Sequence, residues 1–277
     1  MIDIPENIKK SIENEKYVID DMGMSGSTIM VFRGSDRVLK IQENSEEAEN
    51  EVQAMKWISG WINEALYAGK IDKRFFVPRV ILHECKGTKS YLLMTRAYGV
   101  PACNEWYMCH PEYLTGLLAQ ALQELWQVDI SDCPLDWTLD RKLKAAEYNV
   151  KNNLVDIENV EPDTFGSEGF ENPQALLKWL YDHKPEEELV FSHGDFCLPN
   201  IFIDEDEDFE FIDLGRTGIS DKWQDIALCY RSLKHNYSGK YGGKEYPEYD
   251  PNMLFEKLGI APDWEKLRYY ILLDELF

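Results

Sequence analysis

Basic residues are scarce in this sequence of 277 residues: 29 lysines and arginines stand against 51 aspartates and glutamates, so the formal net charge is −22. Nucleic acids and anionic membrane surfaces are bound through basic surfaces, and this composition therefore argues against both as partners. A cationic partner is favoured instead. The hydrophobic fraction of 44% and the aromatic fraction of 13% exclude a disordered acidic chain and predict a folded core.

Long apolar runs and paired cysteine motifs are also missing. No stretch approaches the roughly 18 to 20 apolar residues of a membrane span, and residues 1–7 have neither the basic start nor the apolar run of a secretion signal. The six cysteines form no Cys-x-x-Cys pair and no zinc-type spacing with histidine; they stand at positions 85, 103, 109, 133, 197 and 229. We therefore expect a cytoplasmic protein with reduced thiols.

In the first third of the chain, apolar and polar residues alternate as they do in β-strands, and one stretch has helical spacing. Apolar residues at spacings of three and four predict a helix over 45–61. The strands are expected at 17–19, 28–32, 38–41, 79–84 and 90–95. Residues 1–97 should therefore form a five-stranded antiparallel sheet with one helix.

The pattern becomes mostly helical after residue 98. The expected helices are 113–126, 139–152, 172–183 and further helices from 222 to the end, with a strand at 188–192 and a hairpin of 201–203 with 209–212. The fold class is thus α+β, with a sheet lobe at 1–97 and a mostly helical lobe at 98–277.

The loop 193–200 carries the chemistry. Asp195 and Asn200 stand five residues apart, and Asp213 follows thirteen residues later at the end of the expected hairpin. Phosphoryl transfer needs a carboxylate at the attacking hydroxyl and oxygen ligands for Mg²⁺ on the phosphates. The spacing matches the catalytic-loop and metal-binding elements of kinases. Turn formation accounts for any one of these residues, but not easily for all three in this order.

A kinase also needs a cation for the phosphates and an anion that holds this cation. Lys40 follows Val38 and Leu39 in the strand expected at 38–41. At about 100° per residue, Glu51 falls on the apolar face of the expected helix with Met55 and Ile58. A carboxylate on that face requires a partner, because an unpaired buried charge is unfavourable. We expect Lys40 to be that partner.

Taken together, the chain resembles the aminoglycoside 3'-phosphotransferases, antibiotic kinases with a bilobal protein-kinase-like fold. The resemblance is carried by residues 191–195 with 200–202, 211–218 with 221–227, and the end of the chain, 269–277. It extends more weakly over nearly the whole sequence. The catalytic motifs alone also suit macrolide, choline or homoserine kinases, whereas the terminal segment is far more specific.

The resemblance implies a role for each site residue. Asp195 would be catalytic, Asn200 and Asp213 would bind Mg²⁺, and Lys40 with Glu51 would position the nucleotide phosphates. The remaining nucleotide-binding residues would be Met24 and Ser25 in the phosphate loop and Met94, Thr95 and Ala97 at the hinge between the lobes. The substrate-binding residues would be Glu158, Glu161, Arg216, Asp274, Glu275 and Phe277 with its terminal carboxylate.

The implied reaction moves the γ-phosphoryl group of ATP to the 3'-hydroxyl of an aminoglycoside, and so confers antibiotic resistance by inactivation. GTP stays open as a donor, because Val38 stands where family members carry an aromatic residue that stacks on adenine. We expect a monomer or weak dimer. Two alternatives remain: a kinase of the same fold for another small alcohol, such as a macrolide or choline, and a catalytically idle nucleotide-binding module.

Overall fold

The structure is a computed structural model that describes residues 3–20, 26–69 and 75–277. It divides into two compact units. The first comprises residues 1–101 and 200–217, and the second comprises 102–199 and 218–277. Their secondary structure confirms the α+β class.

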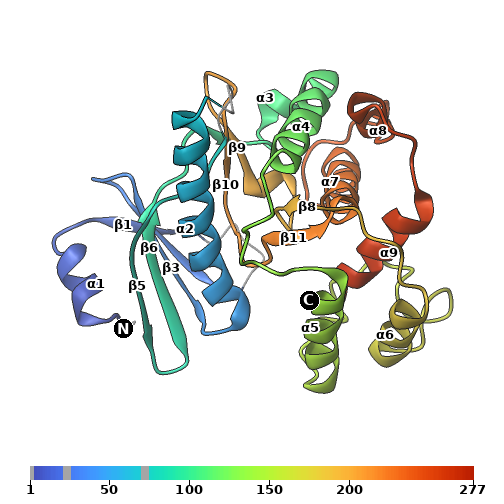
Figure 1. Ribbon diagram of the computed structural model, residues 1–277, viewed down its shortest axis with the longest axis horizontal. Coiled ribbons are helices and arrows are strands. Elements are labelled where there is room, and N and C mark those ends of the chain that lie inside the picture. Colours follow the sequence, from blue (N-terminus) through green and yellow to red (C-terminus); the bar gives the residue numbers. More distant parts are fainter. Residues whose placement is uncertain (1–2, 21–25, 70–74) are drawn as a thin grey trace. The chain divides into compact units, whose positions relative to one another are not determined.

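A five-stranded antiparallel sheet forms the centre of the first unit (Figure 1), in the order β1-β2-β3-β6-β5. These strands are β1 (Tyr17–Asp20), β2 (Thr28–Phe32), β3 (Arg37–Glu43), β5 (Val80–Lys86) and β6 (Lys89–Thr95). Successive side chains of a strand point to opposite faces of the sheet. Leu39 and Ile41 accordingly pack with Ile8 of helix α1 (Glu6–Ser11), whereas Lys40 faces helix α2.

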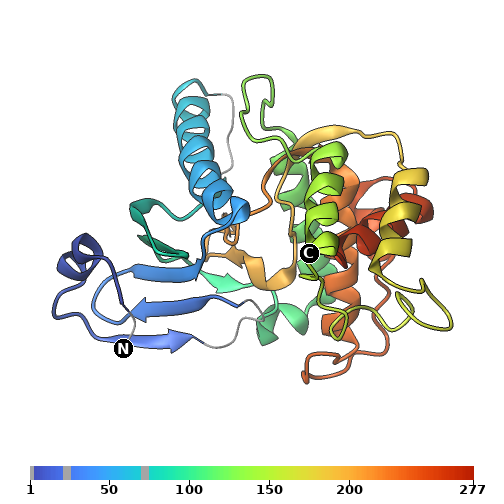
Figure 2. The same ribbon diagram turned by 90° about the horizontal axis from the view of Figure 1, so that it is seen from below.

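Helix α2 (Glu46–Tyr67) lies next to this sheet (Figure 2). It begins where the Ser45 side chain accepts a hydrogen bond from the Ala48 amide at 3.2 Å, an N-cap that satisfies one free donor of the first turn. The helix continues past its expected end at residue 61, because Ile62 and Ala65 prolong the buried stripe.

The hairpin after residue 200 belongs to the first unit. Strand β9 (Ile201–Ile203) pairs with β10 (Phe209–Phe211), and their four-stranded sheet is completed by β4 (Phe75–Phe76) and β7 (Val100–Pro101). The boundary expected at residues 97/98 placed this hairpin with the helical part. Sequence patterning shows that two strands form a hairpin, but not which distant strands pair with its edges.

The second unit is mostly helical, as expected. Its short antiparallel pair joins β8 (Leu189–Ser192) to β11 (Gly218–Asp221). Its α-helices are α3 (Glu105–Met108), α4 (Pro111–Trp126), α5 (Leu139–Lys151), α6 (Pro173–Asp182), α7 (Lys222–Tyr237), α8 (Met253–Leu258) and α9 (Trp264–Asp274). Helix α7 packs against α9, α4 and β8, and buries nearly every apolar side chain that it carries. Within the described residues, no helix combines the length and apolarity needed to cross a lipid bilayer.

Candidate active site

Lys40, Glu51 and Asp213 form one ionic cluster in the first unit. Lys40 Nζ donates to both oxygens of Glu51 at 2.9 Å and to Asp213 Oδ1 at 2.8 Å. Gln42 adds a hydrogen bond to Glu51 Oε2 at 3.1 Å. Burial alone would lower the pKa of Lys40, but the carboxylates of Asp213 and Glu51 outweigh it and raise that pKa above its ordinary value. The pairing expected from the helical face of Glu51 is therefore present.

The β9–β10 hairpin brings Asn200 close to Asp213 along the backbone. The amide of Ile212 donates to the carbonyl of Asn200 at 3.0 Å. Asp213 then adopts a left-handed backbone (φ 61°), a conformation that aspartate tolerates better than most residues. One carboxylate and one amide oxygen suit Mg²⁺, which keeps several waters and completes its shell with phosphate oxygens. No cluster of three or more His, Cys, Asp or Glu residues arranged to hold a metal occurs in the described part of the chain.

Asn50, on α2 beside Glu51, fixes the segment that follows Asp213. Its side-chain amide donates to the carbonyls of Gly215 and Thr217, each at 3.0 Å. Gly215 lies so close to α2 that an added Cβ would come within 3.3 Å of Glu47. The helix that holds Lys40 through Glu51 therefore also anchors the chain next to Asp213.

The loop expected to be catalytic is held by a buried carboxylate of the second unit. Asp225, on α7, accepts hydrogen bonds from the amides of His193 at 2.7 Å and Gly194 at 2.9 Å. Gly194 has a left-handed backbone (φ 86°), which a side chain would strain. His193 Nδ1 accepts from the amide of Asp195 at 3.2 Å, the structural hydrogen-bonding role typical of a loop histidine. The backbone that presents Asp195 is thus held at three successive residues.

Cys197 contacts the candidate catalytic carboxylate directly. Its Sγ donates to Asp195 Oδ1 at 3.1 Å, and its amide donates to the Asp195 carbonyl at 2.8 Å. Burial, and then the charge of Asp195, raise the pKa of the Cys197 thiol well above its ordinary value. A protonated thiol is a donor and a poor nucleophile, so Cys197 supports Asp195 and is not itself a nucleophile.

The hinge residues expected to contact a base lie at the end of β6. Met94 is buried, and the hydroxyl of Thr95 accepts from the amide of Arg79 at 2.8 Å. The amides on either side of Ala97 both donate hydrogen bonds within the protein. The Arg96 amide donates to the carbonyl of Asp36 at 2.9 Å, and the Tyr98 amide donates to the Glu210 carboxylate at 2.8 Å. Met24 and Ser25, expected in the phosphate loop, lie outside the described residues.

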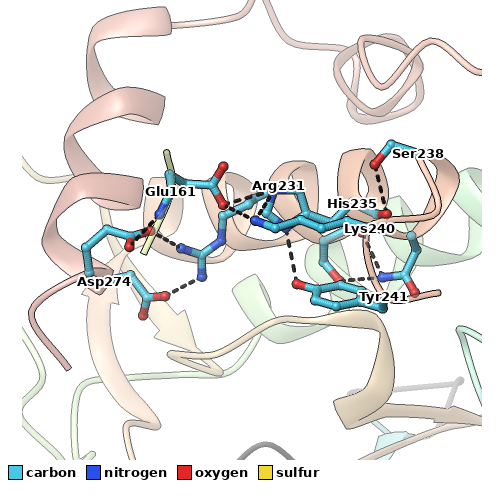
Figure 3. Close-up of polar contacts among 10 residues, drawn as sticks. Glu161, Arg231, His235, Ser238, Lys240, Tyr241 and Asp274 are labelled. Carbon is cyan, nitrogen blue, oxygen red and sulfur yellow. Dashed lines mark hydrogen bonds and ion pairs between the residues drawn. The ribbon is translucent and has the colours of Figure 1, made fainter. Parts of the chain in front are cut away.

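Three of the expected substrate residues, Glu161, Asp274 and Glu275, meet in the second unit. Figure 3 shows Glu161 and Asp274 beside the Arg231 side chain. The amide of Glu161 donates to Glu275 Oε2 at 3.1 Å, and Arg231 donates to Glu275 Oε1 at 3.0 Å. Arg231 also pairs with the carboxylate of Asp274. A carboxylate cluster with an internal arginine is therefore present.

The other expected substrate residues are placed differently. Glu158 is exposed, and its amide donates to Asp156 Oδ1 at 3.1 Å. Phe277 follows the cluster, with its amide bonded to the Asp274 carbonyl at 3.1 Å. Arg216 belongs to the first unit, whereas the carboxylate cluster belongs to the second.

The carboxylates of the cluster differ in their electrostatics. Burial raises the pKa of Glu275 to about 7, although Arg231 opposes this shift. Hydrogen bonds from His235 first, and from Lys240, lower the pKa of Glu161 to about 2. Glu161 is thus a permanent anion near neutral pH, whereas Glu275 titrates there.

Sequence reasoning missed several residues that build these sites: Asn50, Asp225, Arg231, His235 and Lys240. A signal existed for Asp225, because a carboxylate on the otherwise buried α7 requires donors. Arg231 lies six residues further along the same helix. The loop residue Lys240 had no comparable signal, because its position depends on the turn that ends α7.

Comparisons with known proteins agree with this architecture. Residues 22–270 match the model of the phosphotransferase enzyme family. The chain is 38% identical to an aminoglycoside 3'-phosphotransferase from Enterococcus faecalis, over 99% of this chain and 98% of that protein, and 38% identical to one from Staphylococcus aureus, with the same coverage. A crystal structure of aminoglycoside-3'-phosphotransferase of type VIII has the same fold, with a TM-score of 0.74 at 24% identity and coverage of 98% of this chain and 97% of that one.

The kinase-like fold and the match to a phosphotransferase family define the class of this protein. Within that class, the chain belongs to the phosphotransferase enzyme family and, through its near-full-length relatives, to the aminoglycoside 3'-phosphotransferases.

Proposed function

We propose that this protein transfers the γ-phosphoryl group of ATP to the 3'-hydroxyl of an aminoglycoside antibiotic and thereby inactivates it. The observation that carries the proposal is the match to aminoglycoside 3'-phosphotransferases over 99% of the chain. The loop around Asp195 and the carboxylate cluster around Arg231 supply the two chemical requirements of that reaction, namely a group at the attacking hydroxyl and an anionic site for a polycation.

Lys40, held by Glu51, would donate to the nucleotide phosphates. The pair is almost completely buried, so its geometry is fixed before the nucleotide arrives. The base would be read by backbone groups of Thr95 and Ala97 next to the buried Met94, with Met24 and Ser25 at the phosphates. ATP is the proposed donor, and GTP would use the same backbone groups.

Asn200 and Asp213 would hold Mg²⁺, which when bound neutralises charge on the phosphates. Asp195 would accept or orient the proton of the attacking hydroxyl, in direct in-line transfer without a phosphoenzyme. Cys197 supports this role, because its Sγ–H donates to Asp195 Oδ1 and thereby orients the carboxylate. Positioning of this kind is the main contribution that a protein makes to phosphoryl transfer.

The ammonium groups of the antibiotic would bind Glu161, Asp274 and Glu275, with Glu158, Arg216 and the carboxylate of Phe277 as further contacts. An anionic site both attracts and orients a polycation. A choline site would instead surround a quaternary ammonium with aromatic faces. The ionic character of the cluster therefore favours an aminoglycoside over choline.

The test is ADP formation by the purified protein with Mg²⁺ and ATP, then GTP, against kanamycin, neomycin, amikacin, a macrolide and choline. The proposal expects turnover with the aminoglycosides and none with the macrolide or choline. ATP binding without ADP formation on any acceptor would instead identify an idle nucleotide-binding module.

We further propose that the active species is a monomer or weak dimer, which size-exclusion chromatography at varied concentration tests.

A further inference from the structure

The loop after α7 returns a lysine to the carboxylate cluster. Lys240 Nζ donates to Glu161 Oε1 at 2.8 Å, and His235 Nε2 lies 3.0 Å from the same oxygen (Figure 3). Two donors from the chain itself therefore converge on one oxygen of a carboxylate that the proposed function assigns to the antibiotic.

The way in which α7 ends places this lysine. The amide of Lys240 donates to the carbonyl of His235 at 3.1 Å, and the amide of Gly239 donates to the carbonyl of Asn236 at 3.3 Å. This pair of bonds is a Schellman motif, which requires a left-handed residue after the helix. Gly239 supplies it with φ 72°, and a Cβ there would come within 2.9 Å of the Glu245 side chain. The turn thus folds Lys240 back over His235.

His235 is held as a donor to Glu161. Its Nδ1 lies 3.1 Å from the hydroxyl of Tyr241. Burial is the largest cause that raises the pKa of Tyr241, and its hydroxyl therefore stays protonated. The Glu161 carboxylate can only accept a hydrogen bond, so Nε2 of His235 carries the hydrogen and donates to it, whichever way the bond between Nδ1 and the Tyr241 hydroxyl runs. Nε2 then has no lone pair for Lys240, whose ammonium group is left with Glu161 as its anionic partner.

The two cations of the cluster differ in how easily they can be displaced. The Arg231 side chain is 16% exposed and contacts two carboxylates, of which Glu275 is 5% exposed. The Lys240 side chain is 38% exposed and, among the described residues, pairs with the carboxylate of Glu161 alone. Solvent-exposed ion pairs are weak, whereas a buried pair is strongly destabilised when one partner leaves. Arg231 is therefore a fixed part of the site, and Lys240 is replaceable.

We propose that Lys240 is a specificity-determining residue whose ammonium group occupies Glu161 in the free enzyme, and that an ammonium group of the antibiotic binds by displacing it. This inference rests on the proposed function. Displacing Lys240 from Glu161 weakens the net free energy of binding. An antibiotic therefore forms a favourable contact with Glu161 only if it places its own cation at this oxygen. A ligand without that cation leaves Lys240 in place.

The test compares three variants with wild type by calorimetric titration of kanamycin. Lys240→Gln removes the competing charge, Lys240→Arg retains it, and Lys234→Gln removes a charge from the exposed side of the same helix. Displacement of a partly exposed ion pair predicts that Lys240→Gln lowers the kanamycin Kd about two- to fivefold. Lys240→Arg and Lys234→Gln should keep the wild-type Kd, and the KM for ATP should be unchanged in all three.

Other results of these titrations would overturn either the role of Lys240 or the proposed function. An unchanged or weaker affinity in Lys240→Gln overturns the inference, because Lys240 would then not compete. An equal gain in Lys234→Gln also overturns it, because the effect would be long-range attraction and not competition at Glu161. If the wild type binds no aminoglycoside and forms no ADP with any of them, the proposed function itself fails. Wild-type binding with no effect of Lys240→Gln leaves the proposed function standing.

Discussion

Lys40 Nζ lies 2.8 Å from Asp213 Oδ1, so the candidate phosphate-binding cation touches the candidate metal-binding carboxylate. The same nitrogen contacts both oxygens of Glu51 at 2.9 Å. Asp213 is the more accessible anion, with 42% of its side chain exposed against 1% for Glu51. Glu51 is thus the buried partner of Lys40, and Asp213 is the solvent-accessible one.

Replacing Glu51 by Gln should therefore impair the use of ATP. The variant keeps the shape of the side chain but removes a charge-assisted hydrogen bond from Lys40. Because such bonds contribute about 1.5 to 3 kcal/mol, kcat/KM for ATP should fall about tenfold to a hundredfold. Steady-state kinetics measure the fall, and calorimetry without nucleotide should find an unchanged kanamycin Kd. The exposed Glu49 of the same helix provides the matched control, Glu49→Gln. Equal ATP kinetics in the two variants would contradict the assigned role.

Asp195→Asn should abolish most of the turnover and leave the fold intact. The amide cannot accept the hydroxyl proton, and general-base catalysis contributes about 10² to 10⁴ in rate. Single-turnover assays should find the loss in kcat, whereas ATP affinity and Tm should stay near those of the wild type. Asp195→Ala should behave alike. A variant that retains full turnover would disprove the mechanism.

Asp225→Ala should destabilise the second unit, although Asp225 has no proposed contact with substrate. It leaves the buried amides of His193 and Gly194 without their acceptor, which should lower the free energy of unfolding by about 2 to 4 kcal/mol. Urea unfolding followed by tryptophan fluorescence measures the loss. Glu186→Ala, at an exposed position, should change it by less than about 0.5 kcal/mol. Comparable stability of both variants would show that the loop does not depend on Asp225.

These residues show what the sequence could and could not reveal. The contact between Lys40 and Glu51 was predictable, because strand and helix periods place both on faces that meet. Helix α1 was not, because its six residues carry little periodicity, and the burial of Ile8 is decided by the sheet face formed by Leu39 and Ile41. Lys240 was equally hidden, since its place depends on the turn at Gly239.

The hydrogen bonds of Glu161 predict a pH-dependent contribution to stability. Its pKa is about 2 in the folded chain, below the ordinary value of 4.5 for a glutamate. A lowered pKa stabilises the folded state above the unfolded pKa, and this contribution is lost as the pH falls through the folded pKa. The Tm difference between wild type and Glu161→Gln should therefore be constant above about pH 5 and shrink toward pH 2. A difference that is flat across this range would show that Glu161 is not held by His235 and Lys240.

Phosphorylation of the 3'-hydroxyl is best tested by comparing kanamycin with gentamicin, because gentamicin lacks that hydroxyl. The purified protein is incubated with Mg²⁺ and ATP, ADP is measured by a coupled assay, and the phosphate position is located by ³¹P–¹H correlation. We expect ADP formation with kanamycin, a phosphate on its 3' oxygen, and no reaction with gentamicin. Equal turnover of both antibiotics, or a phosphate on another hydroxyl of kanamycin, would contradict it.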